Sequence, residues 1–232
     1  MFSIIIPIYN EEKNIEILLK EIKLSLKNYK NYQVVIIDDC SSDKSNLQVQ
    51  NYIDNNIIEN IYLLKNNKNR GQSYSINHGI KNSKFNTIIT IDGDGQNNPV
   101  DIPKLLEFYL SHDEIFFVGG IRKNRKDSFI KIISSKLANF IRSRYLRDGC
   151  SDTGCSLKIF EKKIFLEFIY FDGIHRFLPA LFKAYNYKTY FISVDHRYRK
   201  HGSSKYGTFD RLFRGIKDMI KVKKIINSIK SK

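Results

Sequence analysis

The stretch ITIDGDGQNNP, residues 89–99, joins an apolar run to a pair of carboxylates. Ile88–Ile91 favour a β-strand, and Asp92 and Asp94 follow at once with only Gly93 between them. Alternation along an extended chain points both carboxylates the same way, and two unpaired like charges cost stability. A divalent cation removes that cost, and Mg²⁺ and Mn²⁺ prefer carboxylate and phosphate oxygens. The stretch therefore predicts a metal site at the end of a strand, with a simple Asp/Gly-rich surface turn as the alternative.

Strand-like and helix-like stretches alternate along the first 120 residues. The expected strands are Phe2–Ile8, Tyr32–Ile37, Ile61–Leu64, Thr87–Ile91 and Ile115–Val118. The expected helices are Glu11–Leu26, Lys44–Ile53, Gly71–Lys81 and Val100–Leu110. This alternation predicts an α/β fold with a mostly parallel central sheet and helices on both faces.

The later part of the chain is less regular. The expected elements are a helix over 128–146, a short strand within SDTGCSLKIF (151–160), a helix near 175–186 and a strand near 188–194. A basic tail follows them. We expect one domain over residues 1–206 and a basic amphipathic helix over residues 207–232.

Three of the expected strands end in polar loops. These loops are PIYNEE (7–12), DDCSSD (38–43) and DGDGQNN (92–98). Ligands of open α/β sheets bind beyond the carboxyl ends of the strands, so we expect the three loops to converge on one edge of the sheet. The convergence indicates a binding site more strongly than any single motif.

Residues in these loops have both ligand-binding and structural interpretations. Asp39 is placed to accept hydrogen bonds from a nucleobase or a ribose, whereas Asp43 is expected to cap the next helix. Asn10 fits a helix N-cap. The residues left to shape and contact a base are Pro7, Tyr9 and Glu11.

The motif NRGQSYSINHGI, residues 69–80, opens a helix with Gly71 directly after Arg70. A helix N-terminus at this point can accept an anion, and a tight turn explains the glycine equally well. His78 falls inside the helix, where we expect a packed side chain and no catalytic role.

Composition excludes several classes of protein. The chain has 42% hydrophobic residues, enough for a sizeable core, and its 3 cysteines are too few for a disulfide framework. The N-terminal apolar run stops at Pro7 and no run of 18 apolar residues exists, so we expect neither a signal peptide nor a membrane span. The net charge of +15 is concentrated in residues 121–147 and 197–232, with nine and twelve Lys or Arg. Localised charge predicts one anionic surface or ligand.

Both basic segments contain an amphipathic helical stripe. The first stripe comprises Phe129, Ile132, Ile133, Leu137, Phe140 and Ile141, and the second comprises Phe209, Leu212, Phe213, Ile216, Met219 and Ile220. Basic amphipathic helices bind anionic membrane surfaces, and packing on the domain core is the alternative for each. Because the chain stops at Lys232, we expect peripheral attachment.

The motifs together resemble family 2 glycosyltransferases of the GT-A fold, a Rossmann-like architecture. The resemblance rests on IIIPIYNEE, IIDDCSSD, NRGQSYSINHGI and IDGDGQNNP in this order, and covers nearly the whole chain. Later segments, among them SDTGCSLKIFEKKIF, HRFLPALFKAYNY and VDHRYRKHGSSKYG, are similar to the dolichol-phosphate (polyprenyl-phosphate) mannosyltransferase-like branch. Gly95, Asn98 and Lys136 depart from the residues common in that family.

The resemblance implies a role for each candidate residue. The nucleoside pocket would be lined by Pro7, Tyr9, Glu11, Ile37 and Asp39. The metal and the diphosphate would be held by Asp92, Gly93, Asp94 and Gln96, with the metal on Asp92, Asp94 and Gln96. The phosphates would be bound by Arg122, Arg199 and Lys205. The residues implied to act in catalysis are Asp92, Asp94, Arg199 and Lys205.

The implied reaction moves a hexose from a nucleotide sugar, GDP-mannose or a UDP-sugar, to a polyprenyl phosphate with Mg²⁺ or Mn²⁺ and with inversion at the anomeric carbon. It would take place at the cytoplasmic face of a membrane. One alternative is a soluble or cell-envelope glycan acceptor, and another is a catalytically silent relative. A basic nucleic-acid-binding module is a third, but its aromatics should interleave with basic residues on an exposed sheet, whereas here they follow helical stripes. We therefore expect no nucleic-acid partner.

Overall fold

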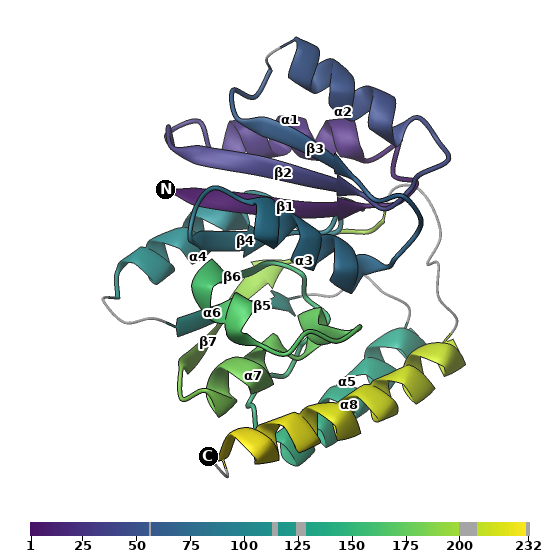
Figure 1. Ribbon diagram of the computed structural model, residues 1–232, viewed down its shortest axis with the longest axis vertical. Helices are drawn as coiled ribbons and strands as arrows, with labels where there is room; N and C mark the ends of the chain where they lie inside the picture. The colour runs from purple at the N-terminus through teal and green to yellow at the C-terminus, as the bar shows by residue number, and fades with distance from the viewer. Residues whose placement is uncertain (56, 113–115, 124–128, 200–207, 231–232) are drawn as a thin grey trace.

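The structure is a computed structural model that describes residues 1–55, 57–112, 116–123, 129–199 and 208–230. Within these ranges seven strands form one sheet in the order β3-β2-β1-β4-β6-β5-β7 (Figure 1). The strands are β1 (Phe2–Ile8), β2 (Tyr32–Asp38), β3 (Ile61–Lys65), β4 (Thr87–Thr90), β5 (Phe116–Lys123), β6 (Lys158–Glu161) and β7 (Lys188–Asp195). The sheet is parallel except for β6, which runs antiparallel to both β4 and β5. The predicted α/β class is confirmed.

Helices cover both faces of the sheet, also as predicted. They are α1 (Ile15–Ser25), α2 (Ser45–Asp54), α3 (Gln72–Asn82), α4 (Asp101–Leu110), α5 (Phe129–Leu146), α6 (Lys162–Glu167), α7 (Leu178–Ala184) and α8 (Thr208–Lys230). A short 3₁₀ helix, η1 (Ile174–Arg176), precedes α7, so the single helix expected near 175–186 is two elements. The expected strand in SDTGCSLKIF lies mainly at its end and is followed by α6, which the sequence patterns did not predict.

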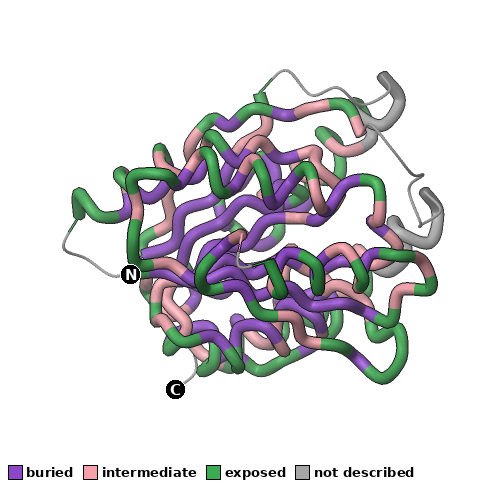
Figure 2. Tube along the Cα trace, turned by 90° about the horizontal axis from the view of Figure 1, so that it is seen from above, coloured by how far each residue is buried: buried purple, intermediate pink, exposed green. Residues whose placement is uncertain are grey.

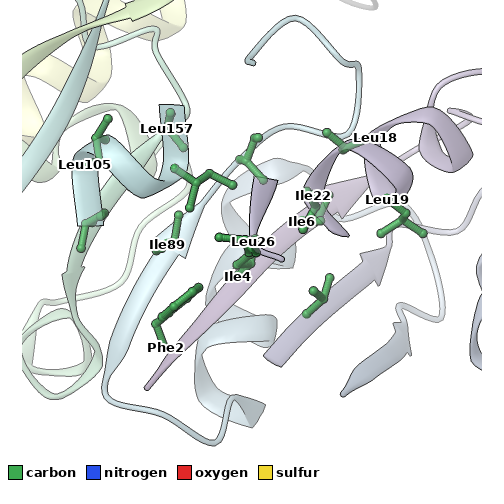
Figure 3. Close-up of a cluster of buried hydrophobic side chains, with 14 of the residues drawn as sticks. Phe2, Ile4, Ile6, Leu18, Leu19, Ile22, Leu26, Ile89, Leu105 and Leu157 are labelled. Atoms are coloured by element: carbon green, nitrogen blue, oxygen red, sulfur yellow. The ribbon is translucent and has the colours of Figure 1, made fainter. Parts of the chain in front are cut away.

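Strand β1 contributes side chains to both layers of the core, one on each face of the sheet. Its side chains at Ile4 and Ile6 enter a cluster with α1 and α4, while Ile5 enters a second cluster beneath α3, α6 and α7. Figure 3 shows the first cluster, to which Leu18 and Ile22 of α1 belong together with Ile4 and Ile6. Burial on both faces explains why the strand is apolar except for Ser3, whose hydroxyl donates to Gln33 Oε1 (Figure 2).

Helices α5 and α8 lie side by side at the margin of the molecule (Figure 1). Val222 and Ile226 of α8 are buried in the second core cluster, so this part of α8 packs on the domain. On α5, by contrast, Leu137 and Phe140 are exposed to 60% and 62%. Of the predicted stripes, the side chains of Phe129, Ile132, Phe209, Leu212 and Phe213 lie outside the described residues.

Candidate active site

The carboxyl ends of β1, β2 and β4 meet at one edge of the sheet, as predicted. Asp39, just beyond β2, donates its backbone N–H to the carbonyl oxygen of Ile8 at the end of β1 (2.9 Å). Gln72, the first residue of α3, donates from its amide Nε2 to Oδ1 of Asp92 beyond β4 (2.6 Å). The loops that follow the first four strands therefore form one connected surface.

The loops after β1 and β2 are hydrogen-bonded to each other. The backbone N–H of Asn10 donates to Ser41 Oγ (2.8 Å), and the backbone N–H of Ser42 donates to Asn10 Oδ1 (2.8 Å). The backbone N–H of Glu11 donates to Ser45 Oγ (2.8 Å). Many of the polar groups that led us to expect ligand binding at PIYNEE and DDCSSD thus form hydrogen bonds from one loop to the other. We call these two loops the interlocked edge.

The expectation that Asn10 caps the first helix is wrong. Asn10 has a φ of 54°, and α1 begins only at Ile15, after Asn14. Asparagine tolerates the left-handed region better than most residues, so Asn10 serves the turn. Asp43 lies one residue before the N-cap of α2, which is Lys44, but its Oδ1 does accept the backbone N–H of Ser45 at the start of the helix (3.0 Å).

Asp39 is buried and holds the start of α3. Its Oδ1 accepts hydrogen bonds from Asn66 Nδ2 (2.7 Å) and the backbone N–H of Arg70 (2.8 Å), and its Oδ2 accepts the N–H of Gly71 (2.7 Å). The helix N-terminus thus faces an anion of its own chain, and Gly71 has the left-handed φ of 84° that the turn requires. His78 bonds Asn66 Oδ1 (2.9 Å) and is a packed residue, as expected. The role of Asp39 toward a nucleoside stays a prediction.

Asp92 and Asp94 stand directly beyond β4, and both are half-buried. The backbone N–H of Asp92 donates to Ser156 Oγ (3.0 Å), and that of Gln96 donates to Asp94 Oδ1 (3.1 Å). Burial, and then the neighbouring charge of Asp94, raise the pKa of Asp92 to about 7. The two carboxylates therefore form the electrostatically strained pair that the sequence predicts.

Lys158, the first residue of β6, was not singled out from the sequence. It is only 4% exposed and pairs in the sheet with Thr90 of β4 and Gly119 of β5. Burial lowers the pKa of Lys158, and the charge of Asp92 opposes that shift. Reciprocally, the Lys158 charge lowers the pKa of Asp92. A buried ammonium therefore lies within electrostatic reach of the acidic pair.

A short bridge brings the basic segment after β7 onto the acidic pair. Asn97 and His196 form an isolated antiparallel β-bridge. Arg199, three residues on, donates from Nη2 to Glu11 Oε1 (2.6 Å) and places Nη1 3.8 Å from Asp94 Oδ2. Arg199 thus lies between the predicted nucleoside and metal residues. Lys205, its predicted companion, lies outside the described residues.

Arg122, at the end of β5, makes a two-pronged ion pair. Its Nε and Nη2 donate to the two carboxylate oxygens of Asp152 (2.8 and 2.7 Å). The pair is largely buried, and a Cβ on Gly154 would lie 2.8 Å from Arg122 Nη2. The SDTGC segment therefore fixes Arg122, whose binding of a phosphate stays a prediction.

The remaining predicted residues differ in how accessible their side chains are to a ligand. Pro7 and Tyr9 keep part of their surface accessible beyond β1. Ile37 is fully buried beneath α3, so a nucleoside would meet its backbone and not its side chain. A Cβ on Gly93 would lie 2.6 Å from Ile8 Cγ2, so this glycine serves the close packing of the tip on β1. The amide Nε2 of Gln96 points to the carbonyl oxygen of Arg197 (3.4 Å).

The residues present fit a hard divalent cation. Asp92 and Asp94 supply carboxylate oxygens, and their mutual repulsion is the cost that a cation removes. Among the described residues no group of three or more His, Cys, Asp or Glu side chains is placed to hold a metal. Oxygens of a bound ligand would therefore complete the coordination, as is usual for Mg²⁺ in phosphate sites.

Comparison with known proteins identifies the family to which the chain belongs. The family model for glycosyl transferase family 2 matches residues 3–168. The chain belongs to glycosyltransferase family 2. It is 32% identical over 224 residues to a dodecaprenyl-phosphate galacturonate synthase of Rhizobium johnstonii, an alignment that spans 95% of this chain and 65% of the relative. It is also 32% identical over 210 residues to an undecaprenyl-phosphate 4-deoxy-4-formamido-L-arabinose transferase of Aeromonas hydrophila, spanning 89% of this chain and 63% of the relative. The chain thus covers somewhat less than two thirds of the length of these curated relatives.

Solved structures show the same GT-A fold. A glucosyl-3-phosphoglycerate synthase of Mycobacterium tuberculosis, crystallised with Mn²⁺, UDP and phosphoglyceric acid, superposes with a TM-score of 0.71 at 13% identity, covering 96% of this chain and 76% of that one. The same enzyme crystallised with Mg²⁺ and UDP gives a TM-score of 0.70, covering 96% of this chain and 77% of that one. This enzyme of the same fold was thus crystallised with a divalent metal together with a nucleotide. In the part of our chain that the structure describes, no helix has the length and apolarity needed to cross a membrane.

Proposed function

We propose that the chain is an inverting, metal-dependent glycosyltransferase that moves a hexose from a nucleotide sugar to a polyprenyl phosphate. The observation that carries the proposal is the acidic pair Asp92/Asp94 beyond β4, with the Arg199 guanidinium 3.8 Å from Asp94. Opposite charges so arranged suit a cation and a diphosphate bound together. The names of both curated relatives, each a polyprenyl-phosphate sugar synthase or transferase, support this acceptor class.

The donor diphosphate would bind between the acidic pair and Arg199. Asp92, Asp94 and Gln96 would hold a divalent ion, which when bound would neutralise the charge that develops on the nucleoside diphosphate leaving group. Arg199 would exchange Glu11 for a phosphate oxygen, and Lys205 would add a second positive charge. Tyr9 and Asp39 would contact the nucleoside.

The acceptor would need no strong general base. A phosphate monoester has a second pKa of about 6, so a polyprenyl phosphate is mostly ionised at neutral pH and is already a nucleophile. A single displacement by this oxygen breaks the bond from the anomeric carbon to the diphosphate and inverts the configuration. Arg122, held by Asp152, would bind a phosphate at this site.

The exposed face of α5 suits an anionic membrane surface. Leu137, Phe140 and Ile141 are exposed to 60%, 62% and 51%, and exposed basic residues, Lys136 and Arg144, lie on the same helix. Apolar side chains beside cations are the pattern of interfacial helices. The three cysteines of the chain are free, which suits a reducing compartment, and the proposed location is the cytoplasmic face of a membrane.

Vesicle co-sedimentation tests the lipid acceptor. We expect the chain to bind phosphatidylglycerol vesicles, and the double variant Leu137→Ser/Phe140→Ser to bind about tenfold more weakly. Leu110→Ser, at a 63% exposed leucine of α4, is the matched control and should change nothing. Absence of the wild type from anionic vesicles at both low and high salt would favour a soluble or glycan acceptor instead, the kind of alternative illustrated by the phosphoglyceric acid bound to the Mycobacterium enzyme.

A thermal-shift panel tests the enzymatic proposal itself. The wild type would be heated with GDP-mannose, UDP-glucose, UDP-glucuronate or a UDP-N-acetylhexosamine, each with and without Mn²⁺. We expect one donor to raise the melting temperature only when Mn²⁺ is also present, because a ligand bound to the native state alone stabilises it by mass action. Stabilisation by nucleic acid, with none by any metal–donor pair, would refute the proposal.

A further inference from the structure

A polar cluster lies beside the acidic pair, apart from the residues proposed to bind the metal, the diphosphate and the nucleoside. It consists of Gln72 and Ser73 at the start of α3, Lys158 of β6 and His175 of η1. Gln72, Asp92 and His175 are all half-buried, so each keeps some accessible surface. The inference drawn from this cluster rests on the proposed function.

Strand register places the cluster on one face of the sheet. Lys158 is paired with Thr90, and the neighbouring pair Ile88 and Phe160 belongs to the core cluster beneath α3 and α7. Side chains two residues apart in a strand share a face, so Lys158 lies on the α3 side. Asp92 is bonded by Gln72 from this same side. The acidic pair therefore has the interlocked edge, beyond β1 and β2, on one flank and Lys158 of β6 on the other, while the start of α3 is joined to both Asp39 and Asp92.

The hydrogen bonds of Ser73 assign the tautomer of His175. Ser73 Oγ accepts the backbone N–H of Gly173 (2.7 Å) and lies 2.6 Å from His175 Nδ1. Ser73 is only 1% exposed, and among the described residues its hydroxyl has no acceptor other than Nδ1, so we assign the hydroxyl proton to the bond with Nδ1. Nδ1 is then an acceptor, and the neutral ring carries its proton on Nε2. Burial and the charge of Lys158 lower the pKa of His175 well below its ordinary value, which keeps the ring neutral. His175 thus presents an N–H donor and has no basic nitrogen left for catalysis.

Lys158 adds further donors to the cluster. Lys158 is 4% exposed as a residue, and in the described part of the chain no hydrogen bond or ion pair joins its ammonium to another residue. Its Nζ is not among the completely buried atoms, so the ammonium can still be reached by a ligand. Burial makes its charge costly, the electrostatic attraction of Asp92 offsets part of that cost, and hydrogen-bond acceptors of a ligand would offset more.

We infer that Gln72, Lys158 and His175 form the subsite for the sugar ring of the donor and donate hydrogen bonds to its hydroxyl or carboxylate oxygens. A diphosphate held at the acidic pair would place the attached sugar within reach of this flank, because the interlocked edge lies on the other. Acceptor oxygens on the ring would satisfy the ammonium of Lys158 and the Nε2–H of His175. The three residues would bind the sugar and not the nucleotide.

The test compares a nucleotide with its sugar conjugates by calorimetry in Mn²⁺. The probes are UDP, UDP-glucose and UDP-glucuronate, with GDP and GDP-mannose as the second series. Lys158→Met and His175→Asn should each weaken binding of the preferred nucleotide sugar about tenfold more than they weaken binding of the bare nucleoside diphosphate. His175→Gln, which restores a donor near the Nε2 position, should recover most of the loss. Lys163→Met, at an exposed lysine of α6, is the matched control.

The outcomes separate this inference from the proposed function. A greater effect of Lys158→Met on UDP-glucuronate than on UDP-glucose would assign the ammonium to a carboxylate, and equal effects would assign it to hydroxyls. If both variants weaken the bare nucleotide as much as its conjugate, Lys158 and His175 act only through Asp92 and the subsite is refuted. Unchanged affinities would refute it as well. A wild type that binds neither nucleotide series with Mn²⁺ would instead overturn the proposed function.

Discussion

The two flanks of the candidate site use polar residues in opposite ways. On the interlocked edge, serines, acids and backbone N–H groups satisfy one another, as in the pairs Asn10–Ser41 and Glu11–Ser45. At the acidic pair and beside it, Asp92 repels Asp94 and Lys158 lacks a hydrogen-bond acceptor in the described chain. Satisfied polar groups stabilise a fold, whereas strained ones mark a place where a ligand stabilises it. The first flank should therefore contribute more to stability, and the second should contribute more to binding of the metal, the diphosphate and the sugar.

The largest expected effect is on the second flank. Asp94→Asn should lower Mn²⁺-dependent affinity for UDP or GDP by about a hundredfold or more, because the cation loses a charged ligand. The free energy of unfolding without metal should not fall, since the substitution also removes the charge that repels Asp92. Calorimetry and urea denaturation measure the two quantities. Undiminished nucleotide affinity in the variant would remove the basis for the metal site.

A large loss of stability is expected for a residue that joins the first flank to α3. Asp39→Ala removes the acceptor of two backbone N–H groups, those of Arg70 and Gly71, and of Asn66 Nδ2. Leaving such donors unpaired should lower the free energy of unfolding by about 2–3 kcal/mol. Urea denaturation measures the change, and a variant as stable as the wild type would show that Asp39 does not hold the start of α3.

A smaller effect is expected from the pH dependence of stability. His175 has a lowered pKa in the folded chain, so below its ordinary value of 6.5 the unfolded chain binds a proton that the native chain does not. This residue should therefore make the protein less stable as the pH falls through 6.5. His175→Gln should lose less stability than the wild type between pH 7 and pH 5. Equal losses in both proteins would contradict a neutral His175 in the folded chain.

The smallest expected effect is again on the interlocked edge. Ser41→Ala leaves the backbone N–H of Asn10 without its Oγ acceptor and should cost about 1 kcal/mol of stability. Nucleotide affinity should stay within twofold of the wild type, because this contact joins two loops and holds no metal ligand. A loss of affinity that exceeds the loss of stability would show that the two flanks are coupled.

Much of this architecture could be predicted because its signals are local. The runs at Phe2–Ile8 and Tyr32–Asp38 and the acidic pair after β4 are visible in short windows, and parallel strand order then brings their loops together. The position of β6 between β4 and β5 has no such signal, because it depends on pairing across about 70 residues. Without that register Lys158 looks like one more lysine in a lysine-rich chain.

The errors have a similar cause. Asn10 carries the chemistry of a helix cap, but its partners Ser41 and Ser42 come from the next loop. Ser73 and His175 are about 100 residues apart, and neither is unusual alone. Side-chain pairing between distant segments decides these roles, and a single sequence contains no record of it.

The contact between Arg199 and Glu11 alters what arrival of a donor would entail. The guanidinium is already engaged by a carboxylate at 2.6 Å, so a diphosphate would replace one counter-ion with another. Such an exchange leaves the number of paired charges almost unchanged. The affinity for the nucleotide should then depend less steeply on ionic strength than the net charge of +15 suggests. The association rate would be limited by how often the ion pair between Arg199 and Glu11 opens.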